Sequence, residues 1–143
     1  MEWVALVTWV LTAGGGFVML GLWLKNGGMA QSETPGERIR ANRILTHFAL
    51  AATGLVVWII YVASDSDALA WIAFIILLPV AGLGFTMLAL WIQRRQAATA
   101  PVPGNGSAEP AEQRFPVPIV VLHGLLAVTT LVLVLLTAAG VGD

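Results

Sequence analysis

Cysteine is absent from the sequence, which excludes disulfide bonds, thiolate-ligated metals and thiol catalysis. Charged residues are scarce, at 10% of the chain against 58% hydrophobic residues. All carboxylates lie outside the long apolar stretches, so the sequence offers no nucleophile–histidine–acid constellation and no acidic group within a span to couple proton movement. It also lacks a phosphate-binding glycine loop, and its seven scattered basic residues do not form a nucleic-acid-binding surface. Hydrolase, nucleotide-binding and nucleic-acid-binding functions therefore find no support.

Four apolar stretches are each long enough to cross a bilayer, whose hydrocarbon core requires about 20 helical residues. They cover residues 3–24, 44–62, 69–92 and 117–139. The mean hydropathy of +0.86 is also far above that of a soluble domain. We therefore expect residues 1–143 to form one all-α integral membrane domain, a bundle of four transmembrane helices in contact with the lipid bilayer.

The basic residues are confined to two of the five segments outside these stretches. The amino-terminal end, the Asp65-Ser66-Asp67 turn and the carboxyl-terminal tail contain none. By the positive-inside rule, we expect both termini outside a bacterial cell membrane and the two longer loops in the cytoplasm. The basic residues are Lys25, Arg38, Arg40 and Arg43 in the first long loop, and Arg94, Arg95 and Arg114 in the second.

The two cytoplasmic loops carry different signals. The first contains Thr34-Pro35-Gly36-Glu37, a capping box with proline at the first helical position, which predicts that the second helix begins there. Arg40, Arg43 and His47 would then lie on one face of that helix. The second loop, residues 96–113, is rich in Ala, Pro, Gly and Ser and is interpreted as a flexible linker without chemistry of its own.

The chain has two histidines, and both lie inside apolar stretches, where an ionisable side chain marks a functional site by default. The octapeptides that start at His47 and His123 share His, Leu, Ala and Thr at their first, fourth, fifth and seventh positions. The first and third spans are similar too, because residues 14–23 and 82–91 are identical at seven of ten positions, at a constant offset of 68. Together these similarities predict an internal duplication of a two-helix hairpin.

A duplicated hairpin keeps its orientation, so the two halves should be related by a pseudo-twofold axis along the membrane normal. The second and fourth helices would then run in the same direction from diagonal corners of the bundle. His47 and His123 each lie about one turn below the cytoplasmic boundary, roughly 6–9 Å at 1.5 Å per residue. We therefore expect the two imidazoles to face each other at equal depth across the bundle axis.

This arrangement suits one haem b per chain, with His47 and His123 as axial metal ligands. Small residues below each histidine and glycines in the first and third spans would leave room for a flat macrocycle. Arg43 is best placed to meet the haem propionates, and Arg40, Arg94, Arg95 and Arg114 lie on the same side. The other residues that we predict to line the cofactor are Gly16, Ala51, Gly54, Gly84, Ala127 and Thr130.

With paired histidines and small residues in four apolar helices, the chain resembles the membrane-embedded b-type cytochromes built on four-helix bundles. Examples are cytochrome b561-type electron carriers and the haem-bearing anchors of succinate dehydrogenase. The resemblance covers all four spans and implies electron transfer. Carriers that cross the bilayer often hold two haems and need four histidines, whereas this chain supplies two. Its composition and repeat also resemble those of small actinobacterial membrane proteins. A donor and an acceptor would be needed, such as a quinone or a cytoplasmic reductase, and the sequence names neither.

Two other interpretations stay open. Met19 and Met87 lie at about the depth of the histidines, so two imidazoles and two thioethers could ligate copper, which both donors suit. Alternatively, the histidines only form hydrogen bonds across the bundle, which contribute about 0.6–2 kcal/mol each. The chain would then be a structural or anchor subunit of a larger membrane complex.

Overall fold

Four long helices make up most of the fold. The computed structural model describes residues 1–31, 39–98 and 110–141. The long helices are α1 (Glu2–Lys25), α3 (Ala41–Ser64), α4 (Asp67–Ala98) and α5 (Val117–Ala138), and the short ones are α2 (Gly28–Gln31) and η1 (Ala111–Arg114). Each long helix is apolar enough to cross a membrane. The predicted all-α bundle of four spans is therefore confirmed, and the chain is an integral membrane protein.

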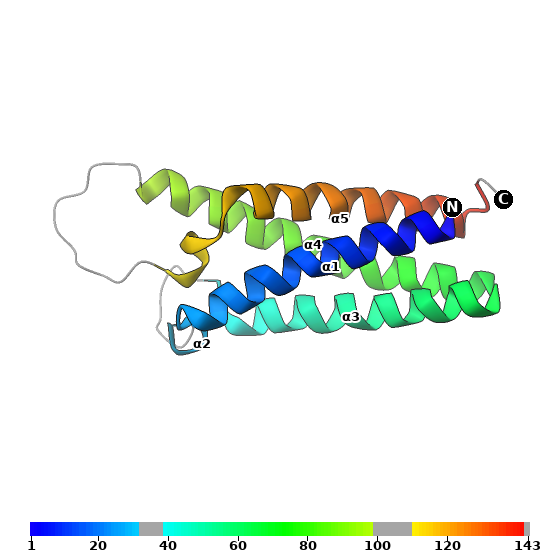
Figure 1. Cartoon of the computed structure of the whole chain (residues 1–143), viewed down its shortest axis with the longest axis horizontal. Helices are drawn as coiled ribbons and strands as arrows, with labels where there is room; N and C mark the ends of the chain where they lie inside the picture. Colours follow the sequence, from blue (N-terminus) through cyan, green and yellow to red (C-terminus); the bar gives the residue numbers. More distant parts are fainter. Residues whose placement is uncertain (32–38, 99–109, 142–143) are drawn as a thin grey trace.

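The four helices pack as two close pairs (Figure 1). α1 packs most extensively against α5, and α3 packs most extensively against α4. Contacts between the pairs, made by α4 with α5 and by α1 with α3, are fewer. α3 and α5 therefore occupy diagonal corners of the bundle, as the sequence predicts. The internal duplication and its pseudo-twofold axis stay predictions.

The connections between helices follow local backbone requirements. α1 ends at Lys25, and the next turn contains Gly27 with a φ of +77°, a conformation that glycine adopts without the steric cost of a side chain. α3 and α4 are joined by a tight turn in which Asp65 has a φ of +54° and its backbone N–H donates to the carbonyl of Tyr61. Both breaks lie within a few residues of the ends of the apolar stretches 3–24 and 44–62.

α3 begins later than its sequence predicts. Arg40 is the N-cap of α3, with an extended backbone at φ −68° and ψ 142°, and neither Ile39 nor Arg40 is helical. The predicted start at Thr34 lies outside the described residues, but a helix that runs through Arg40 is wrong. The predicted helical face therefore keeps Arg43 and His47 and loses Arg40.

The second long loop is not only a linker. α4 continues to Ala98, and η1 packs against the bundle with Ala111 and Glu112 buried. The interpretation of residues 96–113 as a linker without chemistry is therefore wrong at both of its ends, while residues 99–109 lie outside the described part. η1 packs against the bundle because the buried Glu112 carboxylate forms an ion pair with Arg94 and accepts a hydrogen bond from the backbone of Ile39.

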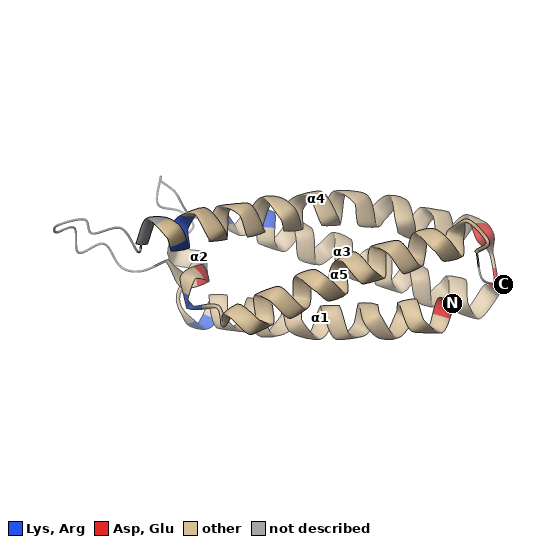
Figure 2. Cartoon of the chain, turned by 90° about the horizontal axis from the view of Figure 1, so that it is seen from above, with Lys and Arg blue, Asp and Glu red and all other residues tan. Residues whose placement is uncertain are grey.

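Both chain termini lie at one end of the bundle, which we call the terminal end, and α2 and η1 lie at the other, which we call the loop end (Figure 1). Figure 2 shows basic residues gathered towards the loop end and acidic residues at the terminal end, apart from the acidic residue in η1. This is the charge asymmetry on which the predicted orientation depends.

An aromatic cluster lies in the core of the terminal half of the bundle. Trp58 is fully buried, and its ring centre lies 6.3 Å from that of Trp9 and 4.7 Å from that of Tyr61. The indole N–H of Trp58 donates to the backbone carbonyl of Glu2 at 3.3 Å. Large aromatic rings dominate core energetics because each buries much apolar surface. This cluster therefore closes the interior towards the terminal end.

η1 closes the interior at the loop end. The Glu112 carboxylate, 2% exposed, accepts hydrogen bonds from the Arg94 guanidinium at 2.6 Å and from the backbone N–H of Ile39 at 3.2 Å. The backbone carbonyl of Glu112 accepts a bond from the Trp91 indole at 3.0 Å. Because a buried charge needs such partners, Glu112 fixes η1 to α4 and to the chain before α3.

Candidate functional site

The two histidines meet in the loop-end half of the bundle. His47 comes from α3 and His123 from α5, and the centres of their rings lie 6.4 Å apart with the ring planes inclined by 59°. The two helices are diagonal partners, so no direct helix packing forces this proximity. The structure thus brings together the two residues on which the predicted site depends.

Each imidazole forms a hydrogen bond with the backbone of the neighbouring helix in its own close pair: His47 of α3 with α4, and His123 of α5 with α1. Nδ1 of His47 lies 3.0 Å from the carbonyl oxygen of Val80 on α4, and Nδ1 of His123 lies 2.9 Å from that of Thr12 on α1. A carbonyl oxygen can only accept, so Nδ1 carries the proton in both rings and the neutral Nε2 keeps its lone pair. The two rings are therefore held in the same tautomer.

Neither Nε2 atom has a hydrogen-bond partner among the described residues. In that same part of the chain, Gln113 carries the one fully buried side-chain nitrogen or oxygen without a partner. Neither Nε2 atom is therefore fully buried. Both lone pairs border accessible space.

Glycines explain how the rings reach these carbonyls. A Cβ atom added to Gly84 would lie 3.3 Å from Cε1 and 3.8 Å from Nδ1 of His47, and one added to Gly16 would lie at the same two distances from His123. Gly84 is four residues after Val80, and Gly16 is four residues after Thr12. Each ring therefore lies across a glycine and bonds to the carbonyl one turn earlier. The predicted site residues Gly16 and Gly84 do contact the histidines.

The histidines lie in a layer of the bundle in which no residue is buried. We call it the histidine layer; it consists of residues 13–22 of α1, 41–53 of α3, 81–90 of α4 and 117–129 of α5. Buried tryptophans bound it on both sides, Trp9 and Trp58 towards the terminal end and Trp23 and Trp91 towards the loop end. Ten residues of α1 span about 15 Å. The histidines therefore lie in the part of the bundle that is packed least tightly among the described residues.

The small residues below the histidines have different surroundings. Gly54 is buried, and a Cβ atom there would lie 3.0 Å from Cζ2 of Trp9, so its space is filled by an indole. Thr130 is buried, donates to the carbonyl of Leu126 and lies 3.5 Å from the hydroxyl of Thr12. Ala51 and Ala127 are half-buried. Gly54 and Thr130 therefore border the site on its terminal side.

The arginines considered for the propionates separate into two groups. Arg94 pairs with Glu112, Arg95 lies 4.9 Å above the ring centre of Trp91, and Arg114 donates to the Asn26 side chain. Arg43, by contrast, is half-buried in α3 one turn from His47 towards the loop end. Among the predicted arginines, Arg43 is the one that α3 positions next to the site.

Sequence reasoning missed the backbone acceptors and the role of Glu112. Thr12 and Val80 are related by the same offset of 68 as the two glycine-rich segments, although they lie just outside the matched residues. A carbonyl oxygen is present in every residue, so no residue type singles out these two. Glu112 had a weaker signal, since it is an acidic residue beside an apolar span and a cluster of arginines.

Among the described residues, no group of three or more His, Cys, Asp or Glu could hold a metal ion. A metal between the histidines would thus need further donors from a cofactor or from other residue types. Comparisons with protein-family models, with curated proteins and with solved structures find no match to this chain.

Proposed function

We propose that this chain binds one haem b inside the membrane, with His47 and His123 as axial ligands, and transfers single electrons. The observation that carries the proposal is the separation of 6.4 Å between the two ring centres. Two opposed imidazoles that bind one metal ion through Nε2, at the usual distance of about 2.0–2.1 Å, have ring centres about 6–6.5 Å apart. The separation in this structure therefore fits one metal ion between the rings.

The hydrogen bonds support ligation through Nε2. A metal-ligating histidine usually donates its other ring N–H to a carboxylate, a carbonyl or water, which fixes the tautomer and raises ligand basicity. Val80 and Thr12 supply such carbonyls to His47 and His123. A neutral imidazole whose lone pair binds iron would also leave no polar atom unsatisfied in the bilayer.

The boundary between the two helix pairs is where a flat cofactor would lie, and it would supply the further donors that a metal ion between two histidines needs. Each histidine is bonded within its own close pair, His123 to α1 and His47 to α4, so the rings face each other across the boundary between the pairs. That boundary is where the helices make fewer contacts and where the histidine layer has no buried residue. A macrocycle between the two rings would lie at this boundary, where the fewest helix contacts would have to separate to admit it.

Arg43 is the residue that we propose for the propionates. It precedes His47 by four residues, about 6 Å along α3. Arg94 and Arg95 follow Gly84 by ten and eleven residues, at least about 15 Å along α4, and Arg94 is already paired with Glu112. Distance and pairing therefore favour Arg43 over both.

Bound haem would supply a one-electron iron couple, while this chain would hold it, exclude water and tune its potential through ligands and hydrogen bonds. The Trp9–Trp58–Tyr61 cluster separates the site from the terminal end. Electron exchange is therefore proposed on the loop side, which is cytoplasmic by the positive-inside rule, with a redox protein, or with a quinone in the bilayer.

A structural role is the second candidate, and the two imidazole–carbonyl hydrogen bonds favour it. They join α3 to α4 and α5 to α1, and such interhelical bonds stabilise membrane bundles by about 0.6–2 kcal/mol each. This role accounts for Nδ1 of each ring. It does not account for the short distance between the two rings or for the accessible Nε2 atoms.

The test is an absorption spectrum of the detergent-purified protein, oxidised and then dithionite-reduced, with metal analysis of the same sample. Expression takes place with added haem precursor so that supply does not limit loading. A low-spin b-type spectrum at one haem per chain is expected. A colourless protein that contains copper would contradict haem binding and favour a copper site formed by His47, His123, Met19 and Met87. A colourless protein without metal would leave the structural role.

A further inference from the structure

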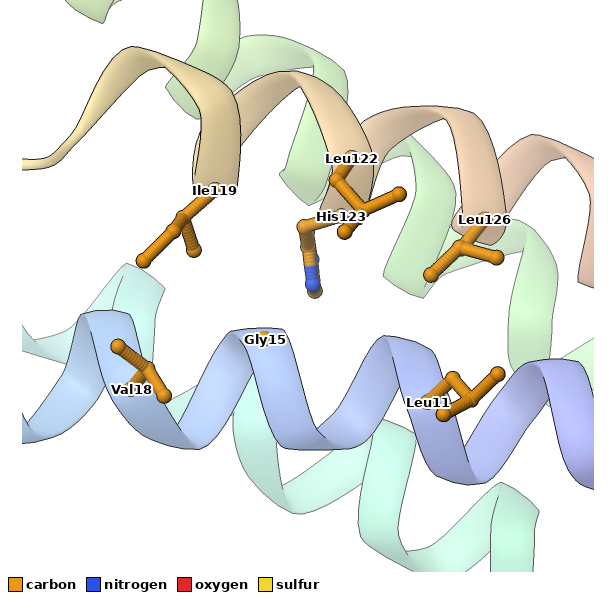
Figure 3. A pocket seen from close by; sticks show the side chains of 7 residues that line it. All are labelled: Leu11, Gly15, Val18, Ile119, Leu122, His123 and Leu126. Atoms are coloured by element: carbon orange, nitrogen blue, oxygen red, sulfur yellow. The ribbon is translucent and has the colours of Figure 1, made fainter.

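A groove runs along the lipid-facing side of the bundle between α1 and α5, with His123 in its wall (Figure 3). Its volume is about 150 Å³. Leu11, Gly15 and Val18 line it on α1, and Leu122, His123 and Leu126 line it on α5. Figure 3 shows the imidazole pointing towards Gly15 on the facing helix.

The groove exists because residue 15 has no side chain. A Cβ atom added to Gly15 would lie 3.4 Å from Cβ of His123, an ordinary contact, so a side chain there would be tolerated and would fill the space. The other helix pair has such a side chain. Gly16 and Gly84 contact their histidines at identical distances, which puts Leu83 at the register position of Gly15.

We infer that the groove is a binding site for one acyl chain of a membrane phospholipid, which covers the edge of His123. The chemistry of the occupant is inferred from the α3–α4 pair, where the hydrocarbon side chain of Leu83 lies at the position that corresponds to Gly15 in the α1–α5 pair. The inference concerns the lipid-facing side of His123 and does not depend on haem binding.

The dimensions and the lining both fit a hydrocarbon chain. From Leu11 to Val18 the groove extends about 10 Å along α1, so a short run of methylenes can lie along it. Apart from His123, every side chain that lines it is aliphatic or absent. Leu11 and Leu122 are 57% and 58% exposed, so the groove opens to the bilayer. An empty groove would forfeit the dispersion contacts of its walls, which an acyl chain restores.

The lining also argues against a polar headgroup. The carbonyl oxygens of a quinone ring need hydrogen-bond donors, and the only side chain with an N–H here, His123, already donates its Nδ1 proton to Thr12. A hydrocarbon chain makes no such demand. An isoprenoid tail would satisfy the same apolar surface, and the experiment distinguishes it.

The test is photo-crosslinking of the full-length protein in phosphatidylcholine vesicles that contain a trace of phospholipid with a diazirine in its acyl chain. Labelled residues are located by mass spectrometry. We expect more labelling at Leu122 and Leu126 than at Ile75, an exposed apolar residue of α4. Gly15→Leu should reduce the groove labelling several-fold and leave Ile75 unchanged. The control is Gly14→Leu, since a Cβ atom at Gly14 meets nothing within 4 Å.

Equal labelling of the groove in the wild type and Gly15→Leu would overturn the inference, as would groove labelling no stronger than that of Ile75. Loss of acyl labelling when unlabelled isoprenoid lipid is added would assign the groove to an isoprenoid chain instead.

Thermal melting of Gly15→Leu in lipid-free detergent checks that the variant folds. The introduced leucine fills the groove when no lipid is present, so we expect the melting temperature to rise by about 2–4 °C. The haem spectrum of Gly15→Leu should equal that of the wild type, which keeps this test separate from that of the proposed function.

Discussion

Gly84 lies directly against His47, so that a Cβ atom at residue 84 would be 3.3 Å from Cε1 of the imidazole. Gly16 has the same relationship to His123. In both cases the missing side chain lets the ring reach a carbonyl one turn earlier in the facing helix. The glycines therefore position the two imidazoles.

The first prediction concerns these glycines. Gly84→Ala and Gly16→Ala should displace the imidazoles by a few tenths of an ångström, weaken the Nδ1 hydrogen bonds and speed haem dissociation. Gly82→Ala and Gly14→Ala are matched controls, because an added Cβ there meets nothing within 4 Å. Both controls should gain the roughly 0.5–1 kcal/mol that alanine contributes over glycine in a helix. Thermal melting and haem dissociation rates measure both effects, and indistinguishable test and control variants would contradict this role.

The second prediction concerns ligation. His47→Ala and His123→Ala should each abolish the six-coordinate, low-spin haem spectrum, because each removes one axial ligand. Met19→Leu and Met87→Leu conserve side-chain volume and should leave the spectrum intact. Absorption spectra of the four variants, reduced and oxidised, measure this. A low-spin spectrum that survives both histidine substitutions would show that the axial assignment is wrong.

The third prediction concerns Arg43. Arg43→Ala should speed haem loss and lower the midpoint potential, because a cation near a propionate favours the reduced, less positive iron centre. Arg40→Ala is the control, since Arg40 is exposed and lies before the first turn of α3. Redox titration and transfer of haem to an acceptor protein measure both quantities. Equal potentials and rates in the two variants would remove Arg43 from the site.

The fourth prediction concerns the loop end. Glu112→Ala leaves Arg94 without its carboxylate and the N–H of Ile39 without its acceptor. Removing one partner of a buried ion pair typically costs about 3–5 kcal/mol, so the melting temperature in detergent should fall markedly. Gln93→Ala, at an exposed position of α4, should change it little. Equal melting of the two variants would mean that η1 does not stabilise the bundle.

Much of the fold could be predicted from composition and spacing, because membrane spans need long apolar runs and basic residues mark loops. The boundary of α3 could not, since the sequence predicts a helix that runs through Arg40, whereas the backbone of Arg40 is extended and α3 begins at Ala41. Glu112 could not either, because its burial depends on Arg94, eighteen residues away, and on Ile39. The two similar octapeptides were enough to predict the histidine pair. The Trp9 ring that occupies the space beside Gly54 could not be predicted, because its position depends on how α1 packs against α3, which a sequence repeat does not specify.

The last prediction concerns orientation, and the absence of cysteine makes it easy to test. Single cysteines can be introduced at exposed positions at either end, as Ser64→Cys at the end of α3 and Ala30→Cys in α2. The basic residues of the loop end predict that Ser64→Cys faces outwards and Ala30→Cys faces the cytoplasm. A membrane-impermeant maleimide should label only Ser64→Cys in intact cells and both variants after permeabilisation. The opposite pattern would invert the orientation and move the proposed electron exchange at the loop end to the outer face.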